Sequence, residues 1–397
     1  MLFRQALNDE FVRRSDAFRE FMLGYAAEIE VYLSALGKIS QATPEQISQI
    51  SNGAIPSAEI FDSQAFSMPF GTAWNNHEQA RAWSDEILER RPTFAADGSQ
   101  IYSAKETSPP IAAVQIGWFE NSHDISEPYE KNARFEILTP DELFRGQDNP
   151  MNPDVRVEER RYLGEADAVG NFLKKKRGWQ KRGERMPIAF FDNPLLVPFS
   201  QQGLQKSFLD ANIDLVRLSA ETRVPLVGFV DRSFSRDIVT MLDSFVANTR
   251  SNTNAVYDAS ILNARNSDRD RSLDAWGDRT CFCYSQRRGL EAFIDDATGR
   301  SSVGFAYLRT TEESVARLDI PSWIYEAGWL NEVVDVVRAE CVIGLGYPYA
   351  LETADAASVI SSRDREVFLR ALQEFANRGK LNFSVARKDA SKGRRRN

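Results

Sequence analysis

The sequence is poor in cysteine and histidine, and these scarcities exclude several kinds of site. Its 397 residues include three cysteines and two histidines. A small, odd number of cysteines indicates a reducing compartment and not a disulfide scaffold. Cys281 and Cys283 have no second pair of ligand residues beside them, which argues against a structural zinc site. With His77 and His123 as its histidines, the chain is also a poor candidate for a Ser-His-Asp triad.

Long apolar segments are missing as well. No apolar run reaches about 18 residues, and the first residues lack the charged-then-apolar pattern of a signal peptide. We therefore expect no membrane span and a cytoplasmic location. Hydrophobic residues make up 42% of the chain and charged residues 27%, which is typical of a soluble globular protein with a sizeable core.

The net charge of −8 argues against a general nucleic-acid coat protein but leaves room for a local basic groove. Basic residues gather at 174–177 and 181–182, on both sides of Trp179, and again at 392–396. A solvated loop and a disordered tail would explain both clusters. An aromatic side chain among cations would equally suit a single nucleic-acid strand, through base stacking and phosphate contacts.

The hydrophobic pattern predicts helices first and a mixed sheet afterwards. Residues 1–90 favour helices, with an apolar face over Phe11–Tyr25 and an N-cap at Thr43. The later pattern predicts strands at 93–97, 111–119, 134–138, 188–192 and 224–230, with helices at 155–173 and 203–221. Three adjacent strands followed by alternating helices and strands are typical of an RNase H-like sheet.

We therefore predict an α/β protein with an RNase H-like mixed sheet flanked by helices and an N-terminal helical extension. The predicted segments are a helical extension over 1–90, the sheet domain over 91–380 and a basic disordered tail over 381–397.

Two aspartates directly follow apolar stretches. Asp97 comes after Thr93–Ala96 and precedes Gly98, and Asp192 comes after Ile188–Phe191. Each could simply cap a turn at the end of a strand. Alternatively, both carboxylates could meet at one metal site, because Mg²⁺ and Mn²⁺ prefer oxygen ligands and two such ions suffice for phosphodiester cleavage.

Several short motifs, in order, carry a resemblance to a known family. They are Ala96–Ser99, an acidic helix, Phe191–Asn193, Gly228–Ser233 and the longer block Gly346–Asp355. Over about residues 93 to 376 the chain resembles the NurA family of repair nucleases. The resemblance implies an RNase H-like fold and a nuclease that requires Mn²⁺, with Mg²⁺ as the alternative.

It further implies a 5′-to-3′ exonuclease and single-strand endonuclease in DNA end resection. Such an enzyme would act on single strands and duplex ends, as a homodimer with a HerA-type hexameric ATPase. By position, Asp97 and Asp192 would be metal ligands, and Tyr347 would lie beside the site. Glu165 would be the ligand from the helix, with Glu159 as the alternative.

Two positions depart from the family pattern. Asp355 stands where many members have histidine and would make a site of four acids. Asp231 stands where lysine is frequent, and Arg232 or Arg236 could take over its phosphate contact. Two other functions stay open: a weak or inactive dimeric scaffold for the ATPase, and an RNase H-like nuclease that acts on RNA.

Overall fold

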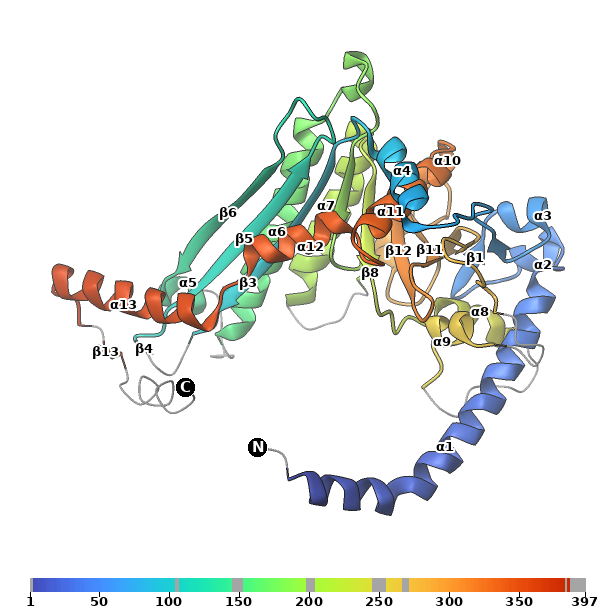
Figure 1. Cartoon of the computed structure of the whole chain (residues 1–397), viewed down its shortest axis with the longest axis horizontal. Helices are drawn as coiled ribbons and strands as arrows, with labels where there is room; N and C mark the ends of the chain where they lie inside the picture. The colour runs from blue at the N-terminus through green and yellow to red at the C-terminus, as the bar shows by residue number, and fades with distance from the viewer. Residues whose placement is uncertain are drawn as a thin grey trace. The chain divides into compact units, whose positions relative to one another are not determined.

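The computed structural model describes residues 3–103, 107–144, 153–197, 204–244, 255–265, 271–382 and 384–385. The chain forms two compact units (Figure 1), which we describe one at a time. Unit 1 comprises Met1–Ala73 and Val230–Ser322, and unit 2 comprises Trp74–Phe229 and Trp323–Asn397. The units thus alternate along the chain, whereas we predicted consecutive segments. The predicted basic tail lies outside the described residues from 386 onward.

The sheet of unit 2 has the strand order β8-β7-β3-β5-β6. Its strands are β3 (Thr93–Ile101), β5 (Ala112–Asn121), β6 (Glu130–Leu138), β7 (Ile188–Phe191) and β8 (Leu226–Val230). The first three form an antiparallel meander, and β7 and β8 run parallel to β3. A meander of three strands extended by two parallel strands is the RNase H-like order, so the predicted α/β mixed sheet is confirmed.

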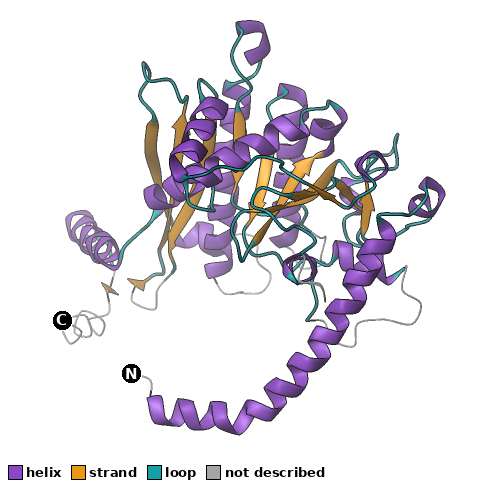
Figure 2. Cartoon of the chain, turned by 45° about the vertical axis from the view of Figure 1, so that its right-hand side comes forward, coloured by secondary structure: helices purple, strands orange, loops and turns teal. Residues whose placement is uncertain are grey.

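Helices cover both faces of this sheet, as the cartoon coloured by secondary structure also shows (Figure 2). The helices of unit 2 are α4 (His77–Leu88), α5 (Pro140–Phe144), α6 (Asp154–Lys175), α7 (Leu204–Thr222), α10 (Ser322–Glu326), α11 (Leu330–Ile343), α12 (Tyr349–Ser358) and α13 (Ser362–Gly379). A short 3₁₀ helix, η1, spans Trp179–Arg182, and two minor strands, β4 (Thr107–Ser108) and β13 (Ser384–Val385), pair with each other.

The two faces can be assigned from two glycines in neighbouring strands. A Cβ on Gly98 of β3 would meet side chains of α6, and a Cβ on Gly117 of β5 would meet the backbone at the end of α12. Because Gly117 is paired with Asp97, the residue next to Gly98, these glycines point to opposite faces. Helix α6 therefore packs on one face of β3 and β5, and α12 packs on the other.

Apolar contacts hold α6 against the sheet. All four residues of β7 are buried, as expected for a strand covered on both faces. The ring of Phe94 in β3 stacks on Phe172 of α6 with 4.8 Å between the ring centroids. Burial of each such aromatic side chain contributes roughly 1.5–3 kcal/mol to the free energy of folding. This contact therefore helps to hold α6 over β3.

Unit 1 contains an antiparallel sheet and the long N-terminal helix. Its helices are α1 (Arg4–Ile39), α2 (Pro44–Ser48), α3 (Glu59–Ser63), α8 (Asp237–Asp243), α9 (Asp258–Asn263) and the 3₁₀ helix η2 (Glu291–Phe293). Its strands are β1 (Ala54–Pro56), β2 (Ser67–Met68), β9 (Arg279–Thr280), β10 (Cys283–Ser285), β11 (Val303–Arg309) and β12 (Val315–Pro321).

The prediction that residues 1–90 form only helices is wrong in one respect. The strands β1 and β2 lie within this segment and pair with β10 and β9. Their partners lie far away in sequence, so no local pattern could reveal the pairing. The predicted N-terminal helices are present as α1, α2 and α4, and Thr43 caps α2 with the expected hydrogen bond.

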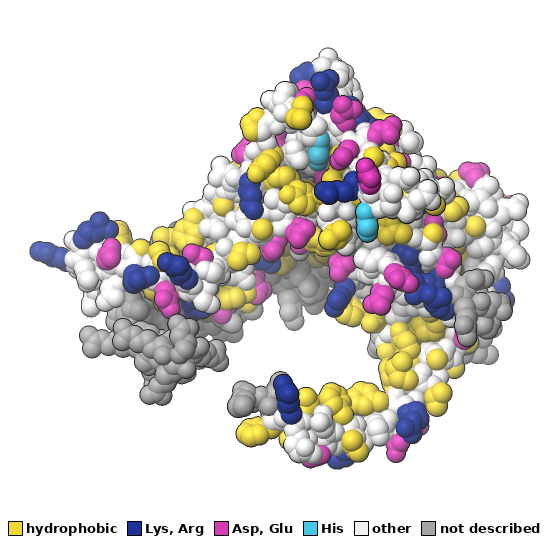
Figure 3. Space-filling view, viewed as in Figure 1, with side chains coloured by type: hydrophobic (Ala, Val, Ile, Leu, Met, Phe, Trp, Pro, Cys, Tyr) yellow, Lys and Arg dark blue, Asp and Glu magenta, His cyan; other side chains and the backbone are white. Residues whose placement is uncertain are grey.

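The predicted apolar face near the start of α1 is exposed. Phe11, Phe18 and Met22 are each 57% exposed, and hydrophobic side chains are visible along α1 in the space-filling view (Figure 3). The second half of the helix is different, because Tyr32 and Ile39 are buried in the core of unit 1.

Unit 1 also holds a buried ionic network around Arg317 of β12. The guanidinium donates to Asp319 at 2.7 Å and to Asp237 at 2.9 Å, and all three side chains are buried. The backbone N–H groups of Asp237 and Val239 donate to Asp258, which fixes the first turn of α8. Since a buried charge is costly without a partner, these residues depend on one another.

Candidate active site

Asp97 lies inside a strand and not at its end. β3 continues to Ile101, and Asp97 is paired with Gly117 of β5. On the other side, β7 ends at Phe191, which is level with Ala96. The predicted turn at Asp97-Gly98 is therefore wrong. At this level of the sheet β3 continues, and it is β7 that ends. The chain leaves the sheet at Asp192, next to the edge of β3 that carries Asp97.

Glu165 reaches this place from α6 because Gly98 has no side chain. A Cβ at Gly98 would lie 2.6 Å from Oε1 of Glu165 and 2.6 Å from Cγ of Arg161. The Glu165 carboxylate is buried and accepts hydrogen bonds from Arg161 at 2.5 Å and from Asn193 at 3.0 Å. The glycine thus makes room for a buried carboxylate against β3, on the face opposite to the Asp97 side chain.

The end of α12 approaches Asp97 from the other face of the sheet. The hydroxyl of Ser358 donates to Oδ2 of Asp97 at 2.6 Å. Asp355 lies one turn earlier on α12, and the charge of Asp97 acts on its carboxyl group, so the two side chains are neighbours.

Asp192 is held by the turn before α12. The hydroxyl of Tyr347 donates to Oδ1 of Asp192 at 2.7 Å, and the Tyr347 ring packs edge-on against Phe229 of β8. A Cβ on Gly344 would lie 2.0 Å from the carbonyl oxygen of Tyr347. This tight turn, which needs glycine, brings Tyr347 to Asp192.

Mutual repulsion among the carboxylates appears in their pKa values. Burial raises the pKa of Glu165 to about 8, and the charges of Asp97 and Asp192 add to this increase while Arg161 opposes it. Burial and the charge of Asp97 also raise the pKa of Asp355. The four acids therefore form one electrostatic cluster, which we call the carboxylate cluster: Asp97, Glu165, Asp192 and Asp355.

The alternative ligand Glu159 lies elsewhere on α6. It accepts hydrogen bonds from Arg156 at 2.5 Å and from Ser207 of α7 at 2.6 Å. Its position is explained by the packing of α6 against α7, whereas Glu165 faces the strand that carries Asp97.

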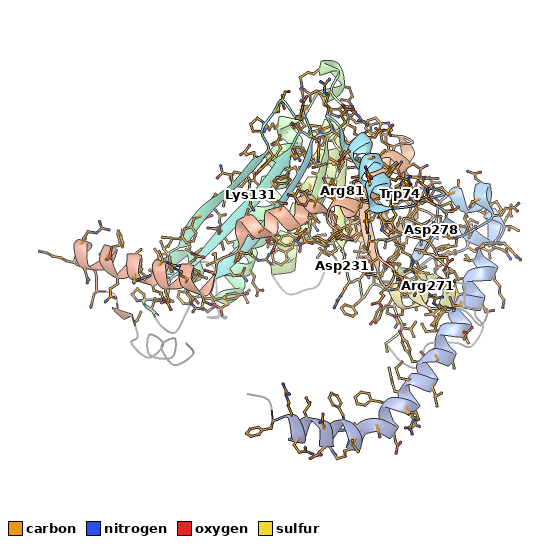
Figure 4. The ribbon with its side chains drawn as sticks, in the orientation of Figure 1. Trp74, Arg81, Lys131, Asp231, Arg271 and Asp278 are labelled. Atoms are coloured by element: carbon orange, nitrogen blue, oxygen red, sulfur yellow. The ribbon has the colours of Figure 1, made fainter. Side chains whose placement is uncertain are left out.

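The residues considered for a phosphate contact belong to unit 1; they are Asp231, Arg232 and Arg236. Asp231, labelled in Figure 4, pairs with the neighbouring Arg232 at 3.9 Å. Arg236 donates to the backbone carbonyl of Val256 at 2.7 Å. None of these contacts involves the carboxylate cluster, which lies in unit 2.

Sequence reasoning overlooked three residues that hold the cluster in place. Arg161 precedes Glu165 by four residues, the spacing that places two side chains on one helix face. Asn193 follows Asp192 directly and turns back to Glu165. Ser358 follows Asp355 by three residues, so helical spacing could have linked them. Their partners across the sheet could not be read from the sequence.

Trp179 does not offer a stacking surface for a base. It is 8% exposed, its indole N–H donates to the carbonyl of Arg223 at 2.9 Å, and its ring packs against Trp329. The idea that this tryptophan binds a single strand is therefore wrong. Lys175 and Lys176 beside it pair with Glu120 at 2.7 and 3.0 Å.

Hard divalent cations suit the carboxylate cluster by the chemistry of its oxygen donors. Among the described residues, however, no three His, Cys, Asp or Glu side chains gather closely enough to hold a metal ion. The Asp97 side chain points to the face covered by α12, where it accepts from Ser358, whereas Glu165 approaches β3 from the face covered by α6. Binding of one ion by both acids would therefore require side chains to move.

The RNase H-like sheet with acidic side chains beside its central strand is an arrangement that suits phosphodiester cleavage. The chain belongs to the NurA family: the family model of the NurA domain matches residues 91–360. It is on this basis a nuclease, that is, a hydrolase whose substrate is nucleic acid. No curated protein matches the sequence.

Two solved structures show a weak similarity. The catalytic domain of human Endonuclease V is 11% identical with a TM-score of 0.32, and the match covers 75% of this chain and 94% of that one. Endonuclease V from Bacillus subtilis is 13% identical with a TM-score of 0.28, and the match covers 79% and 97%. In the described residues, no helix is long and apolar enough to cross a membrane.

Proposed function

We propose that this chain is a DNA nuclease that depends on a divalent metal ion, Mn²⁺ or alternatively Mg²⁺. The carboxylate cluster would hold the ion, with Asp97, Glu165, Asp192 and Asp355 as its ligands. The observation that carries this proposal is that β7 stops level with Ala96, so that Asp192 leaves the sheet beside the strand carrying Asp97, while Glu165 packs against Gly98 of the same strand. Acids gathered in this way repel one another and gain most from a cation.

A bound divalent ion supplies charge neutralisation at the phosphate and lowers the pKa of water. The chain's own side chains provide the arrangement. Ser358 and Tyr347 orient Asp97 and Asp192, and Arg161 and Asn193 hold Glu165 between the sheet and α6. Tyr347 also lies where its hydroxyl could meet a substrate phosphate once it leaves Asp192.

Family membership supports a finer proposal. We infer a 5′-to-3′ exonuclease and single-strand endonuclease in the resection of DNA ends. We also infer a homodimer that works with a HerA-type hexameric ATPase.

The decisive experiment compares Asp97→Asn and Asp192→Asn with wild type on single-stranded DNA in Mn²⁺ and in Mg²⁺. Both variants should lose most turnover and keep their fold. Asp167→Asn is the control, because this aspartate lies on α6, the helix that carries Glu165, but is 68% exposed on the helix surface. Near-normal rates in either site variant would disprove the assignment.

The same assay separates the other functions. Wild-type protein that cuts nothing with any divalent ion would support a scaffold for the ATPase. Faster cleavage of an RNA strand than of the matching DNA strand would support an RNA nuclease. Strands labelled at either end would give the polarity.

A further inference from the structure

Glu340 of α11 is a buried carboxyl group without a hydrogen-bonded cation. Its side chain is 1% exposed. Oε2 accepts a hydrogen bond from the backbone N–H of Ala350 at 2.9 Å. Oε1 is buried and has no hydrogen-bond partner among the described residues, and it lies 3.8 Å from Nε2 of His123. An unpaired carboxylate oxygen at this depth would be costly.

The tautomer of His123 is set by its other nitrogen. Nδ1 lies 2.7 Å from the backbone carbonyl of Arg91, and a carbonyl oxygen can only accept, so Nδ1 carries a hydrogen. In the neutral ring, Nε2 therefore presents a lone pair toward Oε1 of Glu340. Two lone pairs facing each other repel, whereas one proton placed between them forms a hydrogen bond.

The charged groups nearby have other partners and do not pair with Oε1 of Glu340. Asp85 of α4 acts on His123 through its charge, and Asp124 pairs with Arg90 at 3.2 Å. Arg91 pairs with Glu332 at 2.8 Å. The hydroxyl of Thr93 on β3 also acts on Glu340 and lowers its pKa, but by distance and angle Oγ1 of Thr93, like Oε1 of Glu340, has no hydrogen-bond partner among the described residues.

The pKa shifts agree with a neutral pair. Burial raises the pKa of Glu340 to about 7, and burial lowers the pKa of His123 below its ordinary value. Both shifts favour a protonated carboxyl group beside a neutral imidazole.

Glu340 is connected to the carboxylate cluster through α12. Ala350, whose N–H it accepts, lies in the first turn of this helix, and Tyr347 lies three residues before it. The turn between the helices is fixed by a hydrogen bond from the N–H of Gly346 to the carbonyl of Cys341 at 2.7 Å. The end of the same helix carries Asp355 and Ser358. Any shift at Ala350 would therefore move the groups that hold Asp97 and Asp192.

We propose that Glu340 is a positioning residue for the nuclease site: protonated on Oε1, it closes the 3.8 Å separation from Nε2 of His123 by a small shift and donates to it, while Oε2 anchors the start of α12. The catalytic consequence of this proposal rests on the proposed function. The proton shared between Glu340 and His123 does not depend on it. When the proton is lost, the carboxylate faces the imidazole lone pair, and the anchor of α12 weakens.

Two substitutions of Glu340 separate the proton from the packing. In Glu340→Gln, the amide oxygen can accept from Ala350 and the amide N–H can donate to His123, as the protonated acid does. This variant should keep the wild-type cleavage rate below pH 7 and lose the fall in rate that wild type shows above it. Glu340→Leu should cut at least 10-fold more slowly at every pH, since it has no acceptor for Ala350. Equal impairment of both variants at every pH, or no impairment in either, would overturn the proposal.

A second measurement needs no catalysis. The chain has two histidines, so ¹⁵N spectra of the imidazoles are simple, and His77→Asn identifies the signals of the exposed His77. We expect the ¹⁵N chemical shift of Nε2 in His123 to change in one step near pH 7. This step should be absent in Glu340→Gln. An unchanged titration of His123 in that variant would disprove the shared proton. If wild type cuts no DNA while this step is present, only the proposed function fails.

Discussion

The hydroxyl of Tyr347 donates a hydrogen bond to Oδ1 of Asp192 at 2.7 Å and so joins residues that are 155 positions apart. It links the turn between α11 and α12 to the end of β7. Two segments that the sequence presents as separate motifs thus meet at one carboxylate, and this contact can be removed by deleting a single oxygen.

We expect Tyr347→Phe to reduce cleavage about 10- to 100-fold, because a hydrogen bond to a charged group contributes roughly 1.5–3 kcal/mol. The ring contact with Phe229 remains, so the variant should still fold, with a melting temperature that is lower by only a few degrees. Tyr349→Phe is the control, since its ring packs on Phe119 instead. Steady-state cleavage rates check the prediction, and equal rates in both variants would contradict it.

Gly98→Ala should damage both stability and activity. Its Cβ would lie 2.6 Å from Glu165 and from Arg161, so α6 or the two side chains must shift, at a cost of about 1–3 kcal/mol. Gly170→Ala on α6 is the matched control, because its Cβ would meet Leu215 and Leu218 at an ordinary 3.6 Å. Urea unfolding should show the control to be as stable as wild type or more stable, since alanine favours helix. A harmless Gly98→Ala would contradict the packing described here.

Mn²⁺ should stabilise the folded protein through the carboxylate cluster. An ion present at 100 times its dissociation constant adds about 2.7 kcal/mol to the free energy of unfolding. We expect the melting temperature of wild type to rise with added Mn²⁺, and this rise to be smaller in Asp97→Asn. Without metal, that variant should be at least as stable as wild type, because one repelling charge is gone. The same Mn²⁺ response in both proteins would place the ion elsewhere.

The stability of wild type should fall as the pH rises through 7. The pKa of Glu340 is about 7 in the folded chain and 4.5 for an ordinary glutamate, so the folded state keeps a proton that the unfolded state has already lost. Stability is therefore full below about pH 4.5 and decreases, by at most about 3 kcal/mol, up to pH 7 and slightly above. Denaturant unfolding of Glu340→Gln should show a smaller decrease, and the part that remains comes from groups such as Glu165, whose pKa is raised to about 8. An equal pH dependence in both proteins would rule out Glu340 as its origin.

Arg317→Met should destabilise the protein by about 3–5 kcal/mol, because it leaves Asp237 and Asp319 buried without their cation. Arg232→Ala is the comparison: its side chain is 90% exposed and its pairing with Asp231 should be worth under about 1 kcal/mol. Urea unfolding of both variants tests the difference. A loss for Arg317→Met as small as that of Arg232→Ala would show that the network contributes little.

The order of elements in unit 2 was predictable because each strand and helix is marked by its own local pattern. The predicted strand at 188–192 is β7, and the predicted helix at 155–173 is α6. The turn at Asp97-Gly98 was mispredicted for a physical reason. Gly98 is needed for the close approach of Glu165, and not for a turn, and only the packing of α6 on β3 shows this.

The choice between Glu165 and Glu159 illustrates the same limit. Both lie on α6, and nothing in their neighbouring residues tells which one faces β3. In the structure, Glu165 lies beside Gly98, while Glu159 bonds to Ser207 of α7. The assignment of Glu165 as a metal ligand stays a prediction, as do the roles of Asp97, Asp192, Asp355 and Tyr347.

The sequence by itself determined the α/β class, the family and the identity of the acids that can serve a nuclease. These follow from short-range patterns, since periodicity and motif order depend on neighbouring residues. The tertiary structure alone decided that β7 stops level with Ala96, and that Ser358 and Tyr347 orient the aspartates. It also placed His123 against Glu340. These relationships depend on the register of strands and on helices that pack across the sheet, which join residues far apart in the chain.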